Sequence, residues 1–254
     1  MLPLRDSVRP ERTPFFNWLI LFANVGVFLY MALVLKDPQS QQDFAERFGL
    51  VPGRVIYAFS HPRIFLDAPW PAVREAVLPF FTHVFVHGGL AHLIGNMWFL
   101  LIFGDNVEGR LGHKNYLAFY FVCGIVAAGL HIASSHAGAL GVLAGDSGGG
   151  RAVLDAPMVG ASGAIAGVLG GYVVMFPRSR VLTIVPPIFV FEISAWVFLG
   201  LWFVGQFLLA RMTAEPGAGV SVAYWAHVGG FAAGLLLGLL APRRPRDAAP
   251  ARWR

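Results

Sequence analysis

Residues 160–171 read GASGAIAGVLGG, and this stretch is the best single guide to the fold of the chain. The stretch is apolar apart from Ser162, and its small residues recur at intervals of three and four. Small residues at that spacing lie on one face of a helix and let two membrane helices approach closely. The stretch therefore predicts a membrane helix that packs tightly against a neighbour and carries a serine near its start.

A second stretch, AHVGGFAAGLLLG at residues 226–238, has the matching pattern. Gly230 and Gly234 follow His227 by three and seven residues, so all three share one helix face. His227 is therefore expected to face a closely packed neighbour. The two small faces predict a contact between helices in which Ser162 and His227 can form a hydrogen bond.

The composition of the whole chain is that of a membrane protein. Hydrophobic residues make up 56% of the 254 residues and charged residues 13%, whereas soluble domains carry about 25% charged residues. This excludes a disordered, collagen-like, coiled-coil or disulfide-stapled chain, and also a compact soluble enzyme. The net charge of +5 is explained by lysine and arginine in the cytoplasmic loops of a membrane protein. We expect the lipid bilayer, and no nucleic acid, as a partner.

Six segments are long and apolar enough to cross the hydrocarbon core, which takes about 20 residues of helix. They predict an all-α membrane protein, a bundle of six transmembrane helices at residues 15–35, 84–103, 116–135, 158–176, 193–210 and 222–241. Residues 181–191 are apolar but too short to span, so we interpret them as an interfacial or re-entrant stretch. The loop at residues 36–79 is long enough to hold an interfacial helix around residues 72–78.

The distribution of lysine and arginine predicts the orientation of these helices. With the N-terminus inside, 12 of the 19 basic residues lie in inside segments, in accordance with the positive-inside rule. The chain then divides into a cytoplasmic segment (1–14), a six-helix domain (15–241) and a basic cytoplasmic tail (242–254). We expect a multi-pass protein of a bacterial inner membrane, since no organelle transit segment is found.

Polar side chains within the predicted spans gather near one face of the membrane. Such groups are costly in a bilayer, so each is a candidate functional residue. The second, fourth and sixth spans run in the same direction, and their first residues form one polar layer: His92, Asn96, Ser162 and His227. Ser162 and His227 are expected roughly 6–8 Å from the helix entrances. His92 and Asn96 share a helix face, whereas His87 lies about 140° away and is expected to be structural.

This layer has the groups needed for nucleophilic catalysis. A serine hydroxyl becomes a nucleophile when an adjacent base takes its proton, and Ser162 with His227 supplies that pair. An acyl-transfer site also needs donors directed at the developing oxyanion, which His92, Asn96 and the backbone near Ser162 can supply. The fourth and sixth spans carry no acid at this depth, so a dyad is expected rather than a triad.

These motifs together resemble the rhomboid family of intramembrane serine proteases. The resemblance rests on GASG at 160–163, AHVGG at 226–230, the spacing of His87, His92 and Asn96, and EGR at 108–110. It covers about residues 80–240. It implies a six-helix rhomboid fold and hydrolysis of peptide bonds in or beside transmembrane segments of other membrane proteins, which would be its substrates.

The resemblance also implies roles for individual residues. Ser162 would be the nucleophile and His227 the base, with His92, Asn96 and the Ser162 backbone as the oxyanion hole. Structural support would come from Gly160, Gly163, Gly230, Gly234, Glu108 and Arg110. Some family members carry, four residues after the serine, an aromatic side chain that stacks on the histidine. That position is Ala166 here, so another group must orient His227.

Other interpretations stay open at this point. A non-catalytic scaffold could bind transmembrane clients on the same fold, although inactive relatives would be expected to lack the serine or the histidine. A small transporter would show a polar pathway or repeated half-helices rather than one polar layer. His83, His87 and His92 lack the further ligands of a zinc site, so no metal or other cofactor is expected. The substrate, the gating element and the oligomeric state stay open.

Overall fold

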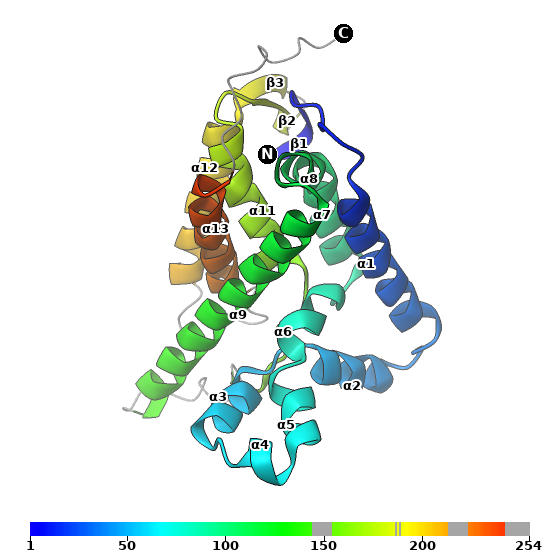
Figure 1. Cartoon of the computed structure of the whole chain (residues 1–254), viewed down its shortest axis with the longest axis vertical. Coiled ribbons are helices and arrows are strands. Elements are labelled where there is room, and N and C mark those ends of the chain that lie inside the picture. Colours follow the sequence, from blue (N-terminus) through cyan, green and yellow to red (C-terminus); the bar gives the residue numbers. More distant parts are fainter. Residues whose placement is uncertain (144–153, 186, 188, 213–222, 242–254) are drawn as a thin grey trace.

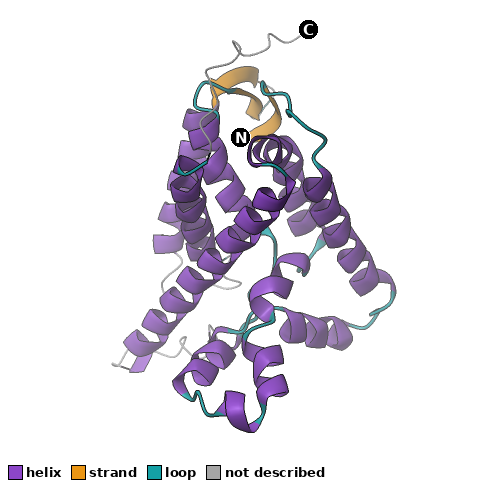
Figure 2. Cartoon of the chain, viewed as in Figure 1, coloured by secondary structure: helices purple, strands orange, loops and turns teal. Residues whose placement is uncertain are grey.

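The computed structural model describes residues 1–143, 154–185, 187, 189–212 and 223–241. Helices dominate the structure, and a small three-stranded sheet lies at one end of the bundle (Figures 1 and 2). We call this end the sheet end. The opposite end, from α2 (Pro38–Phe48) to α6 (Pro79–Thr82), is the loop end. The predicted basic tail, residues 242–254, lies outside the described residues.

The predicted helical membrane bundle is confirmed. Each of the six predicted spans contains a helix: α1 (Phe15–Leu33), α7 (Leu90–Phe99) with η2 (Leu100–Gly104) and α8 (Asp105–Leu111), α9 (His113–Leu143), α11 (Ser162–Met175), α12 (Ala195–Met212) and α13 (Tyr224–Leu239). Within the described residues, three stretches are long and apolar enough to cross a membrane: Phe15–Leu33, Leu90–Leu111 and His113–Ala137. The apolar stretches of α11, α12 and α13 are shorter, so the number of six spans stays a prediction.

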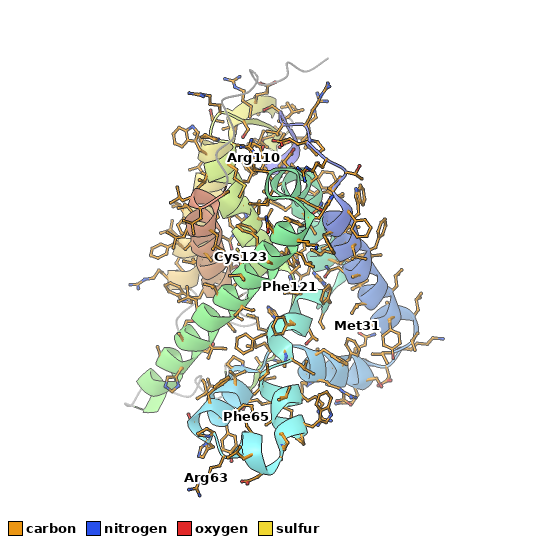
Figure 3. The ribbon with its side chains drawn as sticks, viewed as in Figure 1. Met31, Arg63, Phe65, Arg110, Phe121 and Cys123 are labelled. Carbon is orange, nitrogen blue, oxygen red and sulfur yellow. The ribbon has the colours of Figure 1, made fainter. Side chains whose placement is uncertain are left out.

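Helices α11 and α13 contact each other backbone to backbone. A methyl group built at Gly230 would overlap the carbonyl oxygen of Gly163, and one built at Gly234 would overlap the carbonyl oxygen of Gly167. A methyl group at Gly167 would also overlap the side chain of Cys123 on α9, near the middle of the bundle (Figure 3). Small residues thus bring the two helices as close as their backbones allow, which is the contact that their sequences predict.

The second predicted span continues beyond residue 103 to Leu111. Its middle turn, η2, is π-helical, and a turn of this kind disturbs the usual pairing of main-chain carbonyl groups. Asn17 of α1 donates its side-chain N–H to the carbonyl oxygen of Leu100 at 3.2 Å, and its Oδ1 accepts the hydroxyl of Tyr116 at 2.6 Å. One buried asparagine therefore ties α1, the second span and α9 together.

The sheet end differs from the sequence-based expectation. The N-terminal segment contains β1 (Leu2–Asp6), which pairs antiparallel with β2 (Arg180–Val185). The stretch expected to be interfacial or re-entrant belongs to an antiparallel pair, β2 and β3 (Phe189–Ser194). A short apolar run fits a strand and a buried helix equally well by pattern alone. Its partner β1 is more than 170 residues away along the chain, so local sequence does not reveal the sheet.

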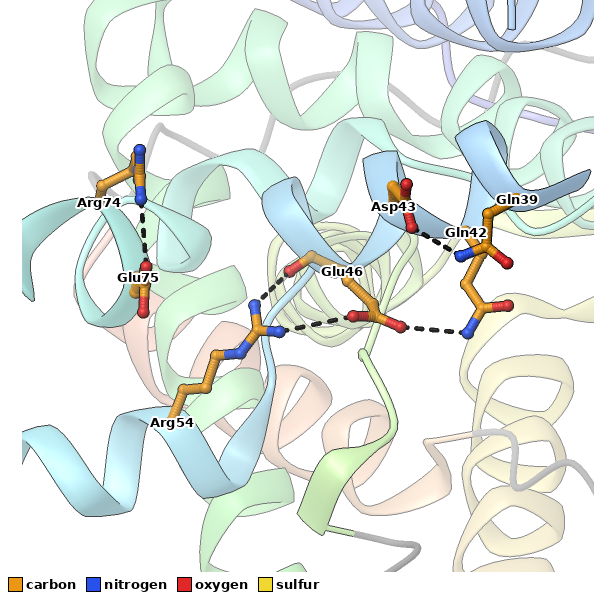
Figure 4. A network of polar contacts seen from close by, with 7 residues as sticks. All are labelled: Gln39, Gln42, Asp43, Glu46, Arg54, Arg74 and Glu75. Carbon is orange, nitrogen blue, oxygen red and sulfur yellow. Dashed lines mark hydrogen bonds and ion pairs between the residues drawn. The ribbon is translucent and has the colours of Figure 1, made fainter. Parts of the chain in front are cut away.

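Short helices build the loop end: α2, α3 (Pro52–Ser60), α4 (Ile64–Asp67), α5 (Pro69–Ala76), α6 and the 3-10 turn η1 (His83–Phe85). The sequence predicted one interfacial helix around residues 72–78, which overlaps α5. The exposed pair Arg54–Glu46, at 3.5 Å, connects α3 to α2, and a second exposed pair, Arg74–Glu75 at 3.1 Å, lies within α5 (Figure 4). Such surface pairs contribute at most about 1 kcal/mol each.

Candidate active site

Ser162 and His227 lie within hydrogen-bond distance of each other. Oγ of Ser162 and Nε2 of His227 are 2.7 Å apart. Ser162 begins α11 and His227 lies in the first turn of α13, so the glycine contact between these helices sets the distance between the two side chains. His227 is buried and Ser162 is partly exposed. The hydroxyl is therefore accessible while the imidazole is shielded.

The start of α11 differs from the depth that the sequence predicted. Ser162 is the first residue of its helix rather than a residue one turn inside it. The first N–H groups of a helix have no acceptor within the helix. The backbone N–H of Ser162 can therefore donate a hydrogen bond to an oxygen atom that binds beside the hydroxyl. A serine one turn deeper could not donate in this way, because its N–H would be bonded within the helix.

Gly160 shapes the chain just before Ser162. Its φ of +115° is in a region that L side chains rarely adopt, and its N–H donates to the carbonyl oxygen of His83 at 2.9 Å. A methyl group built at Gly160 would lie 2.8 Å from Nε2 of His92 and 3.6 Å from Nδ2 of Asn96. Glycine at this position thus lets both side chains lie against the backbone two residues before the serine.

The structure brings His92 and Asn96 to the same place and adds His87 to them. Nδ2 of Asn96 donates to Nε2 of His87 at 2.9 Å, and the rings of His87 and His92 have centroids 5.1 Å apart. The sequence placed His87 on a different helix face from His92. However, α7 begins only at Leu90, so helical rotation does not apply to His87. This buried histidine holds the amide of Asn96 in one orientation.

Two residues of α12 complete the surroundings of His227, and sequence analysis missed both. Nδ1 of His227 donates to Oε1 of Gln206 at 2.6 Å, and the ring of Trp202 lies with its centroid 5.9 Å from the imidazole. Trp202 thus supplies, from another helix, the aromatic neighbour that Ala166 does not. Gln206 could have been found from its sequence. It is a strongly polar residue within a predicted span, and it lies four residues from the span's end.

Glu108 and Arg110 lie at the sheet end, and Figure 3 shows Arg110 there. The carboxylate of Glu108 is fully buried and accepts the backbone N–H groups of Phe16 at 3.0 Å and Asn17 at 2.7 Å. It therefore caps the start of α1 from another helix, where the first N–H groups lack helical acceptors. Arg110 forms an ion pair with Glu11 at 3.3 Å. Glu108 therefore joins the second span to α1, and Arg110 joins it to the N-terminal segment.

The groups gathered around Ser162 are a hydroxyl, imidazoles, amides and backbone N–H groups. In the part of the chain that the structure describes, no cluster of three histidine, cysteine, aspartate or glutamate side chains is placed to hold a metal ion. The hydroxyl and its imidazole can transfer a proton. The amide and imidazole N–H groups next to Gly160 can stabilise a negatively charged oxygen atom. This arrangement is suited to acyl transfer.

Comparison of the sequence with known proteins identifies the family of this chain. Residues 74–244, more than half of the chain, match the Rhomboid domain family. Mouse Rhomboid-related protein 2 is 26% identical over 226 residues, which are 89% of this chain and 63% of that protein. Yeast Rhomboid protein 1, mitochondrial, is 29% identical over 159 residues, 61% of this chain and 39% of that protein. Human Presenilin-associated rhomboid-like protein, mitochondrial, is 29% identical over 121 residues, 48% of this chain and 28% of that protein.

The matched region contains every motif on which the resemblance was based, from His87 to His227. The chain spans less than two thirds of the length of each of these relatives. Two of them are named mitochondrial, so the comparisons give no support to the expected bacterial inner membrane. The long apolar helices and the matched domain together identify an integral membrane protein. The chain belongs to the rhomboid family.

Proposed function

We propose that this protein is an intramembrane serine endopeptidase that cleaves peptide bonds in or next to transmembrane segments of other membrane proteins. The observation that carries the proposal is the 2.7 Å contact between Oγ of Ser162 and Nε2 of His227. It occurs at the start of a helix beside two further polar side chains, His92 and Asn96. The family supports the same chemistry, since rhomboid proteins are generally serine proteases.

The first step is attack by Ser162 on the carbonyl carbon of the scissile peptide bond. Nε2 of His227 accepts the hydroxyl proton as the Oγ–C bond forms, because an isolated serine hydroxyl is a weak nucleophile. The imidazolium then returns this proton to the leaving amine, and the C–N bond breaks. Water hydrolyses the resulting acyl-enzyme with His227 again acting as the base.

The second requirement is stabilisation of the oxyanion that forms on the carbonyl oxygen. The side chains of His92 and Asn96 lie against Gly160, and the backbone N–H of Ser162 lies at the start of α11. One N–H of the Asn96 amide is engaged by His87 at 2.9 Å, which leaves the second for the oxyanion. Donors fixed before the reaction avoid the cost of reorganisation during it.

The remaining predicted residues are assigned supporting roles. Gly163, Gly230 and Gly234 set the distance between the dyad helices. Glu108 braces the second span against α1, and Arg110 braces it against the N-terminal segment. Substrates are expected to be membrane proteins with small or helix-breaking residues near the site, because cleavage needs an extended backbone at the serine.

A fluorophosphonate probe tests the activated serine directly. The purified protein in detergent should be labelled when Oγ bonds to phosphorus and fluoride leaves. Ser162→Ala and His227→Ala should both abolish labelling. Ser134→Ala is the matched control, because the Ser134 hydroxyl donates to a carbonyl oxygen of its own helix at 2.8 Å; it should be labelled like the wild type.

Cleavage of single-pass membrane proteins by the wild type, reconstituted in liposomes, tests the substrate class. A folded wild type that is neither labelled nor active on such substrates would overturn the proposal in favour of a scaffold. A Ser162→Ala variant that still cleaved them would refute the dyad.

A further inference from the structure

We propose that Gln206 is a positioning residue that holds His227 in the proton state required of a base. The inference rests on the proposed function and adds a third member to its dyad. It begins with the contact between Nδ1 of His227 and Oε1 of Gln206, which measures 2.6 Å. A carbonyl oxygen can only accept a hydrogen bond, so this contact requires the proton of the neutral imidazole to reside on Nδ1.

This requirement determines the state of the other ring nitrogen. In a neutral imidazole one nitrogen is a donor and the other an acceptor. With its proton on Nδ1, His227 presents an unprotonated Nε2 to Oγ of Ser162 at 2.7 Å. That nitrogen can take the hydroxyl proton. The opposite tautomer would direct an N–H at the serine and could not act as its base.

The placement of Gln206 also fits this role. It lies on α12, so the imidazole is held between α11 on one side and α12 on the other. Trp202 is one turn before Gln206 on the same face of α12, and its ring lies 5.9 Å from the imidazole at an interplanar angle of 35°. The amide fixes the rotation and tautomer of the ring, and the indole restricts its tilt.

A neutral amide and a carboxylate differ in what they do for the base. Both accept a hydrogen bond from Nδ1–H, but a carboxylate also stabilises the positively charged imidazolium. Leucine has similar size to glutamine and accepts no hydrogen bond. Gln206→Leu and Gln206→Glu therefore separate the hydrogen bond from the packing of the side chain.

The test measures the rate of fluorophosphonate labelling of the full-length protein against pH, for the wild type, Gln206→Leu and Gln206→Glu. Gln206→Leu should slow labelling by about 10- to 100-fold, since positioned acid–base catalysis contributes about 10²- to 10⁴-fold in total. Gln206→Glu should be labelled at a rate within about threefold of the wild-type rate. The acid limb of its pH profile should move to higher pH. Gly205→Ala is the matched control, because nothing lies within 4 Å of a methyl group built there; it should behave like the wild type.

A second measurement distinguishes positioning from a general structural role. If Gln206 acts through its hydrogen bond to His227 rather than through packing, then Gln206→Glu should keep the labelling that Gln206→Leu loses, because the carboxylate still accepts the hydrogen bond from Nδ1–H. Thermal unfolding of each variant checks that it is folded.

The outcomes separate this inference from the proposed function. Loss of labelling in Ser162→Ala together with an unchanged rate and pH profile in Gln206→Leu would overturn the inference alone. The inference would also be overturned if Gln206→Leu labelled slowly only because it is unfolded and Gln206→Glu had the same pH profile as the wild type. A folded wild type without serine labelling would overturn the proposed function and this inference with it.

Discussion

Side-chain hydrogen bonds join the helices at the sheet end, whereas glycine contacts join the helices that carry Ser162 and His227. At the sheet end, Asp6 of β1 accepts hydrogen bonds from the Tyr172 hydroxyl and, at 2.9 Å, from Nδ2 of Asn106. The indole of Trp98 donates to the carbonyl oxygen of Pro3 at 2.6 Å. The N-terminal segment thus contacts the second and fourth spans through specific polar groups.

At the dyad, the backbones of α11 and α13 are the contact surface. The overlap of methyl groups built at Gly230 and Gly234 with opposing carbonyl oxygens shows that no side chain separates these helices. A hydrogen-bonded connection can lose one member and keep its geometry through the others. A backbone contact cannot keep its geometry in this way, because one added methyl group forces the helices apart. The two regions should therefore respond differently to substitution.

The strongest test of this comparison is Gly234→Ala. The added methyl group would overlap the Gly167 carbonyl oxygen, and overpacking of this kind costs about 3 kcal/mol or more when the backbone must move. We expect a large loss of thermal stability in detergent and loss of fluorophosphonate labelling, because Ser162 and His227 separate with their helices. Gly205→Ala on α12 adds the same methyl group in open space and should leave both properties unchanged. Wild-type stability and labelling in Gly234→Ala would contradict the account of the α11–α13 contact.

The next test, Glu108→Ala, removes a polar connection instead. It leaves the N–H groups of Phe16 and Asn17 without the carboxylate that accepts them, and buried donors without a partner cost about 1–3 kcal/mol each. We expect a loss of at least about 2 kcal/mol in the free energy of unfolding, with the labelling rate of the folded fraction unchanged. Glu46→Ala is the control, because its pair with Arg54 is exposed and worth at most about 1 kcal/mol. A slower labelling rate per folded molecule in Glu108→Ala would show that the two ends are not independent.

The same comparison explains which parts of the fold were predictable from the sequence. Helix packing through small residues depends on local spacing, so the contact of Gly163 with Gly230 could be predicted from two short stretches. The polar layer of Ser162, His227, His92 and Asn96 was likewise predictable, since each polar group in a span is unusual.

What the sequence did not predict depends on contacts between distant segments. The pairing of β1 with β2 joins residues more than 170 positions apart. The β1 sequence, LPLRD, ends in two charged residues and has no pattern typical of a strand, and the apolar run that begins in β2 fits more than one structure. Glu108 was expected to give structural support, but its contact with the start of α1 depends on tertiary structure. His87 was misplaced because a helical rotation was assumed for residues that precede the helix. Gln206 lies in the fifth span, outside the second, fourth and sixth spans whose first residues predict the polar layer, so that pattern did not indicate it.

A third expected effect concerns Asp6, and it appears only as a dependence of stability on pH. Burial raises the pKa of the Asp6 carboxyl from 3.8 to about 7; the neighbouring Asp105 adds to this, and the hydrogen bond from Tyr172 opposes it. Between these two values the folded state binds a proton that the unfolded state has released. The stabilisation is therefore fully present below about pH 4 and is lost as the pH rises through about 7, with a slope of at most about 1.4 kcal/mol per pH unit.

Asp6→Asn should remove this slope, because an amide accepts the same hydrogen bonds and does not titrate. The measurement is the free energy of unfolding from pH 4 to pH 8 in the wild type, in Asp6→Asn and in the control Asp43→Asn. The carboxylate of Asp43 lies on the exposed surface of α2 and accepts a hydrogen bond from the side chain of Gln39 (Figure 4). Only Asp6→Asn should differ from the wild type in slope, while all three should be labelled by the fluorophosphonate at equal rates when folded. An Asp6→Asn variant that retained the wild-type slope would show that the polar contacts at the sheet end do not depend on this proton.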